Sequence, residues 1–287
     1  MENSKEVLGF NDLLKALDSK VNTNVIKVYI NSLDCHVTLK EIGVKESKTL
    51  SKIGIENSEN QAVLYEASLA MIQSLIIDAP DDFNIMNISE FDKNKLMIAV
   101  YRQNILNEKL PVKCSNCEGD FEYVVNFDEI LSAMDEMDIS EQKLDIETDK
   151  LKFEIFYGFP KVSRMIEYFR ILYSKKNKKL KEDSESNSVS QIDYIDLFIK
   201  RVNIIDKENS TEANPNIELD LVNCTINEAL TFINHLPSVI LYNSKHGAMV
   251  KINENCLQRL SSLEKKVLCP HCGEETVASI GINDFFG

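Results

Sequence analysis

Apolar residues at every second position predict short strands in both halves of the chain. Residues 24–30 are rich in Val and Ile, Asn31-Ser32 suits a turn, and Cys35, Val37 and Leu39 alternate with polar neighbours. In that alternation Cys35 faces the core. Similar alternation predicts strands over residues 121–127, 151–155 and 276–282.

Apolar residues at helical spacing predict a helix that begins at Ser58, with Gln61 as the partner in a capping box, and ends at Pro80. The apolar stripe expected to face the core comprises Val63, Leu64, Ala67, Ala70, Met71 and Leu75.

Four more helices are predicted by the same spacing. The helix over residues 89–105 has a wide apolar face and is expected to lie buried between other elements. Near its end, Arg102 is either an ion-pair partner or a complement to the helix C-terminus. The other predicted helices cover residues 162–173, 192–202 and 225–236, the last capped by Thr225 with Glu228 as its partner.

Polar segments divide these elements into regions. Their composition predicts an exposed helix or linker over residues 134–150, a disordered loop over residues 175–190 and a loop over residues 206–216. The fold class expected is α+β, with mixed helices and short antiparallel strands. The expected regions are a lead-in (1–23), an α+β domain (24–130), an acidic connector (131–150), a mainly helical domain (151–265), and a final segment with the tail (266–287).

Two cysteine pairs with the same spacing are the strongest chemical signal. Cys114 and Cys117 enclose two residues, as do Cys269 and Cys272, and such pairs let two thiolates bind one tetrahedral metal ion. At the same offsets after each pair, alternating residues predict a strand in the same phase. The sequence therefore predicts one four-cysteine zinc ribbon that joins the middle of the chain to its C-terminal part, with Zn²⁺ in a structural role.

Three other interpretations of the cysteines remain open: two independent pairs without metal, a redox pair, and a disulfide framework. A redox pair of the thioredoxin type follows a strand and opens a helix, whereas strand signals follow both pairs here. Seven cysteines are an odd number and no secretory signal is visible at the N-terminus, which disfavours a disulfide framework. His271, inside the second pair, is expected to point to solvent. Cys224 and Cys256 are expected to be buried filler.

Composition narrows the classes of partner. The chain has 287 residues, 44% of them hydrophobic, and a net charge of −14. An acidic surface repels nucleic acid and anionic membranes, and no apolar run is long enough to span a bilayer. Reduced thiols then favour the cytoplasm, or a particle assembled there.

No catalytic motif is found in the sequence. There is no serine elbow, metalloprotease helix, dinucleotide fingerprint or glycine-rich phosphate loop. His36, His235 and His246 each suit an ordinary structural position. The protein is therefore expected to be a binding or building protein without a small-molecule substrate, and not an enzyme.

In this order of elements the chain resembles the baseplate hub and hub-assembly proteins of T-even-like contractile-tailed bacteriophages. The resemblance covers most of the chain from about residue 25, whereas the zinc site rests on this chain's own residues. It implies a non-catalytic role in building the baseplate hub, other baseplate and tail proteins as partners, and a location in the virion or in the host cytoplasm during assembly. The matching segments are Lys40–Glu46, Phe91–Leu96, Tyr101-Arg102, Val112–Cys114, Cys269–Cys272 and Asp284–Phe286.

Two other functions are consistent with the cysteine pairs. One is a zinc-ribbon accessory factor of transcription or nucleic-acid processing, against which the acidic charge counts. The other is a redox enzyme that uses one cysteine pair. The apolar tail, Phe285-Phe286, is expected to dock on the protein's own core or on a partner.

Overall fold

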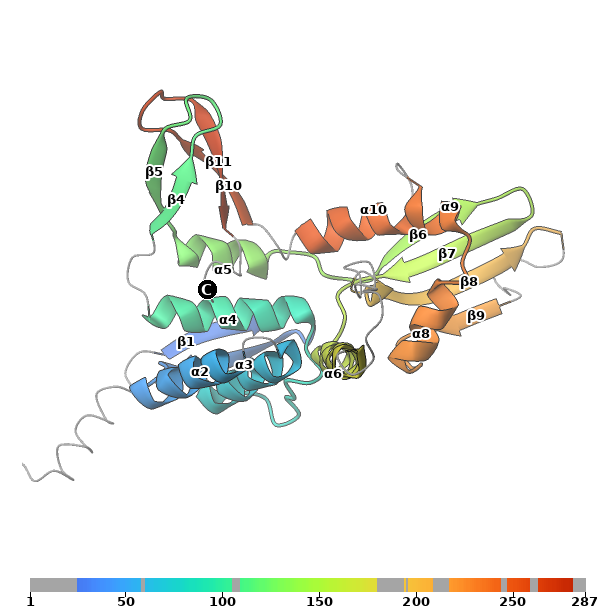
Figure 1. Cartoon of the computed structure of the whole chain (residues 1–287), viewed down its shortest axis with the longest axis horizontal. Helices are drawn as coiled ribbons and strands as arrows, with labels where there is room; N and C mark the ends of the chain where they lie inside the picture. Colours follow the sequence, from blue (N-terminus) through green and yellow to red (C-terminus); the bar gives the residue numbers. More distant parts are fainter. Residues whose placement is uncertain are drawn as a thin grey trace, which may run out of the picture.

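The structure is a computed structural model that describes residues 25–57, 60–104, 109–179, 194, 196–208, 217–243, 247–258 and 263–280. Its helices and antiparallel strands confirm the predicted α+β class. The molecule has two regions. The ribbon comprises residues 109–124 and 263–280, and the body comprises the other described residues (Figure 1). The predicted lead-in and the Phe285-Phe286 tail lie outside the described residues.

The body begins with the predicted strand pair. β1 (Val25–Ile30) pairs with β2 (Cys35–Lys40), and β3 (Ile76–Asp78) adds a third antiparallel strand beside β2. Alternation buries one face of this sheet, as predicted for Val37 and Leu39, while Cys35 is half-buried. The sequence did not predict β3 or the helix α2 (Val44–Glu56).

The helix α3 (Gln61–Leu75) corrects the prediction of a helix from Ser58 to Pro80. Its cap is Asn60, whose side chain accepts a hydrogen bond from the Val63 amide, and β3 separates the helix from Pro80. Apolar side chains occur around most of this helix, so their spacing did not fix the buried face. The buried residues are Ala62, Tyr65, Leu69, Met71, Ile72 and Leu75, of which the predicted stripe contained two.

The helix α4 (Glu90–Asn104) confirms the prediction for residues 89–105. It lies at the centre of the first half of the body, which contains β1 to β3 and the helices α2, α3, α4 and α5 (Phe127–Asp135) (Figure 1). It packs on β1, α3, α5 and α6 (Val162–Lys179), as its wide apolar face predicted. Arg102 near its end forms an ion pair of 2.7 Å with Asp128 of α5.

Charged side chains are buried in the first turns of α4, which the apolar pattern did not predict. Asp92 and Lys95 are wholly buried. The Asp92 carboxylate accepts hydrogen bonds from the Asn31 amide (2.8 Å), the Ser32 amide (3.0 Å) and the Ser89 hydroxyl (2.6 Å). The Lys95 amine donates to Asn31 Oδ1 (2.7 Å) and pairs with Asp135. This network fastens the turn after β1 to α4 and α5.

A four-stranded antiparallel sheet organises the second half of the body. Its strands, in spatial order, are β6 (Gln142–Glu147), β7 (Leu151–Tyr157), β8 (Ile199–Asp206) and β9 (Ile217–Asp220). The prediction of β7 is confirmed. The prediction of an exposed helix or linker over residues 134–150 is wrong, because β6 pairs with β7 and α5 continues to Asp135.

Two further predictions in this half are corrected. Residues 199–202 belong to β8 and pair with β7, so the predicted helix over residues 192–202 is wrong there. Residues 175–179 continue α6 and do not form the predicted disordered loop, of which residues 180–190 lie outside the described part of the chain. The predicted loop over residues 206–216 overlaps the end of β8 at Asp206, and its residues 209–216 lie outside the described part.

Short helices complete the body. In α8 (Ile226–Ile233) the capping box of Thr225 and Glu228 forms as predicted. The helix α8 is followed by α9 (Ser238–Tyr242), α10 (Ala248–Ile252) and the π-helical turn η1 (Asn253–Leu257). The region expected to be mainly helical therefore contains three strands of the sheet as well.

One cluster of buried apolar side chains joins the two halves of the body. Phe91 of α4 stacks against Phe159 (5.2 Å between ring centroids), which contacts Phe198 (6.1 Å). This cluster extends along the chain from Ile26 to Cys256 and includes no described residue of β10 or β11. Among the described residues, no helix is long and apolar enough to cross a membrane.

Candidate metal centre

Two β-hairpins form the ribbon, which projects from the body beyond α5 (Figure 1). In the first, β4 (Lys109–Lys113) pairs with β5 (Asp120–Val124). In the second, β10 (Leu263–Leu268) pairs with β11 (Glu275–Ile280). Each cysteine pair occupies the turn of one hairpin, so residues more than 150 positions apart meet at the same end of the ribbon.

The two cysteine turns have the same backbone hydrogen bonds. The amide of the first cysteine donates to a carbonyl five residues later, from Cys114 to Gly119 (3.0 Å) and from Cys269 to Glu274 (2.9 Å). The residue after the second cysteine has positive φ in both turns, 57° at Glu118 and 76° at Gly273. Amides at equivalent positions, Asn116 and His271, each lie 3.4 Å from the sulfur of the first cysteine. The predicted similarity of the two halves therefore extends to their hydrogen bonds.

The four sulfur atoms converge. Cys114 Sγ lies 3.8 Å from Cys272 Sγ, and Cys117 Sγ lies 3.7 Å from Cys269 Sγ. All four lie within 4.8 Å of one another. A tetrahedral site with metal–sulfur bonds of about 2.3 Å has sulfur–sulfur edges of roughly 3.8 Å. The four cysteines can therefore bind a metal ion.

The other cysteines lie outside this cluster. Cys256 is buried in the body core, as expected. Cys224 is only half-buried, and its thiol donates to the Asp220 carbonyl. Cys35 is also half-buried, and burial raises the pKa of its thiol.

The thiols of Cys114 and Cys117 differ in acidity. The Cys117 and Asn116 amides lower the pKa of Cys114 to about 6. The Gly119 amide acts to lower the pKa of Cys117, but burial and the neighbouring thiols raise it to about 12. Bringing four thiolates together therefore requires a cation, which is the role of a bound metal.

Two polar contacts connect the hairpins beside the sulfurs. Thr276 Oγ1 accepts from the Ser115 amide (3.2 Å) and lies 3.3 Å from the Ser115 hydroxyl. The His271 ring Nε2 lies 3.0 Å from the Asp120 carbonyl oxygen. His271 is exposed, but its ring spans the two turns and does not simply point to solvent. A Cβ atom at Gly119 would lie 2.8 Å from that ring, so glycine permits the contact.

Sequence reasoning did not assign roles to these connecting residues. Thr276 lies at an inward strand position, and the equivalent position of the first hairpin has Phe121. A hydroxyl at a position expected to face inward was the only sign of this contact in the sequence. The predicted alternation holds for the buried Thr276 and Ala278 of β11. In the first half β5 ends at Val124, and Phe127 begins α5.

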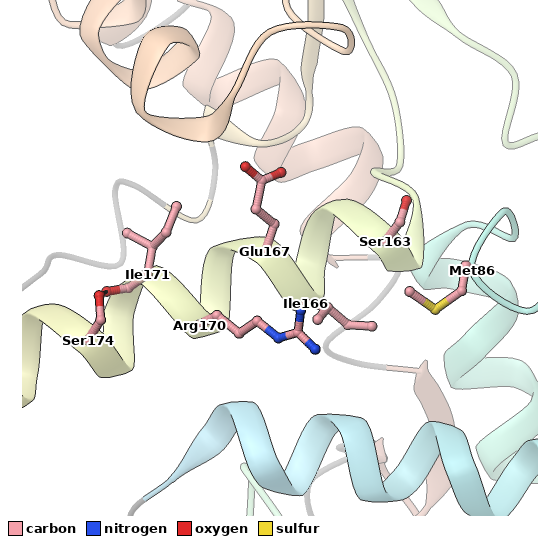
Figure 2. Close-up of a pocket in the computed structure, with 7 residues that line it drawn as sticks. All are labelled: Met86, Ser163, Ile166, Glu167, Arg170, Ile171 and Ser174. Carbon is pink, nitrogen blue, oxygen red and sulfur yellow. Dashed lines mark hydrogen bonds between the residues drawn. The ribbon is translucent and has the colours of Figure 1, made fainter.

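A surface groove lies away from the ribbon, along α6 (Figure 2). Its volume is about 350 Å³. Its charged residues have structural partners: Arg170 pairs with Glu66 of α3 (2.7 Å), and Glu167 accepts from the Ile226 amide (3.4 Å). The lining residues of the groove include no histidine or cysteine. Nothing in the groove forms a nucleophile and base pair.

Comparisons of the chain with protein-family models, with curated proteins and with solved structures found no match.

Proposed function

We propose that Cys114, Cys117, Cys269 and Cys272 bind one structural zinc ion, and that the protein is a non-enzymatic structural or assembly component. The observation that carries this proposal is the convergence of four sulfurs at separations that suit a tetrahedral metal. Four thiolates fill the coordination of zinc, so no position remains for a substrate or an activated water.

Metal analysis of the purified protein tests the first part. We expect about one zinc per chain, by the ligand count of a structural site. Thiolates also bind iron, which would give a coloured protein through charge transfer, whereas the zinc protein is colourless. A purified chain without stoichiometric metal would contradict the proposal.

Charge on the ribbon favours a protein partner over nucleic acid. Three of its lysines face carboxylates: Lys109 pairs with Glu122 (2.7 Å), Lys113 with Glu118 (3.8 Å) and Lys266 with Glu275 (3.7 Å). Paired lysines on a chain of net charge −14 are poorly suited to phosphate backbones.

Two exposed apolar side chains lie on the outward face of β10–β11. Leu268 is 68% exposed and Val277 is 47% exposed. The register places them on the face opposite Thr276 and Ala278, which are buried toward the first hairpin. Exposed apolar side chains on a projecting module suit contact with another protein.

The partners that we propose are other proteins of a phage tail baseplate, with the protein acting in the virion or in the host cytoplasm during hub assembly. This part rests on the resemblance of the segments named above. The test is mass spectrometry of purified phage particles and of assembly intermediates. We expect the chain in at least one of them together with hub proteins. Absence from both, or retention on DNA-cellulose at physiological salt, would favour the nucleic-acid-associated alternative instead.

A further inference from the structure

We propose that the metal ion acts as a latch for the second hairpin of the ribbon. With the metal bound, β10–β11 is held against β4–β5, and without it this hairpin separates while the body stays folded. The inference rests on the metal site proposed above and concerns what that site controls.

The described side chains of the second hairpin have no share in the hydrophobic core of the body. The core cluster extends along the chain to Cys256, with Leu257 packed against it, and the described residues of β10–β11 lie outside it. In contrast, β4–β5 is anchored, because Tyr123 packs against the cluster and the next residues, Val125 and Phe127, are buried in it. Loss of the metal therefore leaves the first hairpin attached, and leaves the described side chains of the second without a core contact.

Protein contacts between the hairpins are few. The hydrogen bonds recorded between their described residues, apart from the sulfur contacts, are those of Ser115 with Thr276 and of His271 with Asp120. The two hairpins remain separate two-stranded sheets with no strand pairing between them. Because an isolated two-stranded hairpin is at best marginally stable in water, the four sulfurs and their metal provide the main attachment.

The latch controls the display of a surface. Leu268 and Val277 have a fixed position relative to the body only while β10–β11 is held in place. A chelator that removes the metal therefore abolishes this surface without unfolding the rest of the protein.

Hydrogen exchange read by mass spectrometry, on the full chain loaded with zinc and then treated with chelator under reducing conditions, tests the latch. We expect exchange in peptides from residues 263–280 to accelerate by roughly tenfold or more, since protection reports local opening. Peptides from α4 and β7 should keep their protection. The substitution Cys272→Ser should reproduce this pattern, whereas Cys224→Ser, at a half-buried thiol outside the cluster, should not.

Two results would overturn the latch. Unchanged exchange in residues 263–280 after metal removal means that protein contacts alone hold the hairpin. Accelerated exchange throughout the body means that the metal stabilises the whole fold. Metal content measured on the same samples separates this inference from the site itself. A chain that never held metal refutes the zinc site. A chain that binds metal, but whose exchange in residues 263–280 does not change when the metal is removed, refutes only the latch.

Discussion

The body and the ribbon are stabilised by different interactions. The body buries large side chains completely, among them Phe91, Phe153 and Phe198, and each contributes about 1.5–3 kcal/mol by leaving water. Among the ribbon side chains that the structure describes, the most buried are small, namely Cys114, Cys269 and Ala278. Hydrophobic burial therefore explains the stability of the body, whereas the described side chains of the ribbon bury too little to explain that of the ribbon.

The free energy of metal binding is large enough to supply the stabilisation that hydrophobic burial does not provide in the ribbon. Ordering a backbone costs about 1–2 kcal/mol per residue, which a few small buried side chains do not offset over a whole hairpin. Structural zinc contributes about 10–16 kcal/mol in zinc-finger peptides at pH 7. A substitution in the core should therefore act on the whole molecule, whereas a substitution near the sulfurs should act locally.

The largest effect is expected from Phe91→Ala in the body. Phe91 is wholly buried against Phe159, and the cavity should lower the free energy of unfolding by about 3–5 kcal/mol. Urea denaturation followed by circular dichroism measures it. The matched ribbon variant is Leu268→Ala, at a side chain that is 68% exposed, with an expected change within about 0.5 kcal/mol. Similar losses for the two variants would remove the distinction between body and ribbon.

A smaller loss is expected from Asp92→Asn, which keeps the shape of the side chain. The carboxylate accepts from the Asn31 and Ser32 amides and from the Ser89 hydroxyl, and an amide nitrogen would face one of these donors. We expect a loss of about 2–3 kcal/mol in unfolding free energy. The control is Asp128→Asn, whose side chain is 68% exposed in its ion pair with Arg102. A surface pair is worth at most about 1 kcal/mol, so equal losses would contradict a special role for the buried network.

The convergence of the four cysteines could be predicted because its signal is local. The spacing of two cysteine pairs and the strand pattern after each are visible in short windows, and thiolates have few alternative roles. The contacts that join the hairpins could not be predicted, because Ser115 meets Thr276 only after residues 161 positions apart come together.

The elements of the body also divide into those that local sequence signals predict and those that long-range contacts decide. The strand β7 and the helix α8 were predicted because strict alternation and a capping box are local signals. In β8 the apolar residues Ile199 and Val202 have a spacing that a helix shares, and pairing with β7 decided in favour of a strand. In β6 the alternating Leu144 and Ile146 were present, but the acidic composition around them was interpreted as a linker.

Within the ribbon, Thr276→Val should weaken metal binding without removing a ligand. Valine has the shape of threonine but does not accept the hydrogen bond from the Ser115 amide. Because partners around a metal site orient its ligands, we expect a loss of about tenfold in zinc affinity. Competition with a chromophoric chelator measures the affinity. Thr231→Val, on the exposed side of α8, removes a hydroxyl that donates to the Asn227 carbonyl and should leave the affinity unchanged. An equal effect of both variants, or none at Thr276, would show that the ribbon does not depend on this contact.

The smallest effect has the opposite sign and uses the similarity of the two cysteine turns. Glu118 and Gly273 occupy equivalent positions with φ of 57° and 76°, a conformation that favours glycine. Glu118→Gly should therefore stabilise the metal-bound ribbon by about 1 kcal/mol, since the exposed ion pair with Lys113 that it removes is worth little. Gly273→Ala should destabilise it by a similar amount through backbone strain alone, because an added Cβ meets nothing within 4 Å. The rate of zinc release to a chelator should fall several-fold for the first variant and rise for the second, while the urea midpoint of the body stays constant. A shift of that midpoint in either variant would mean that the ribbon and the body unfold as one unit.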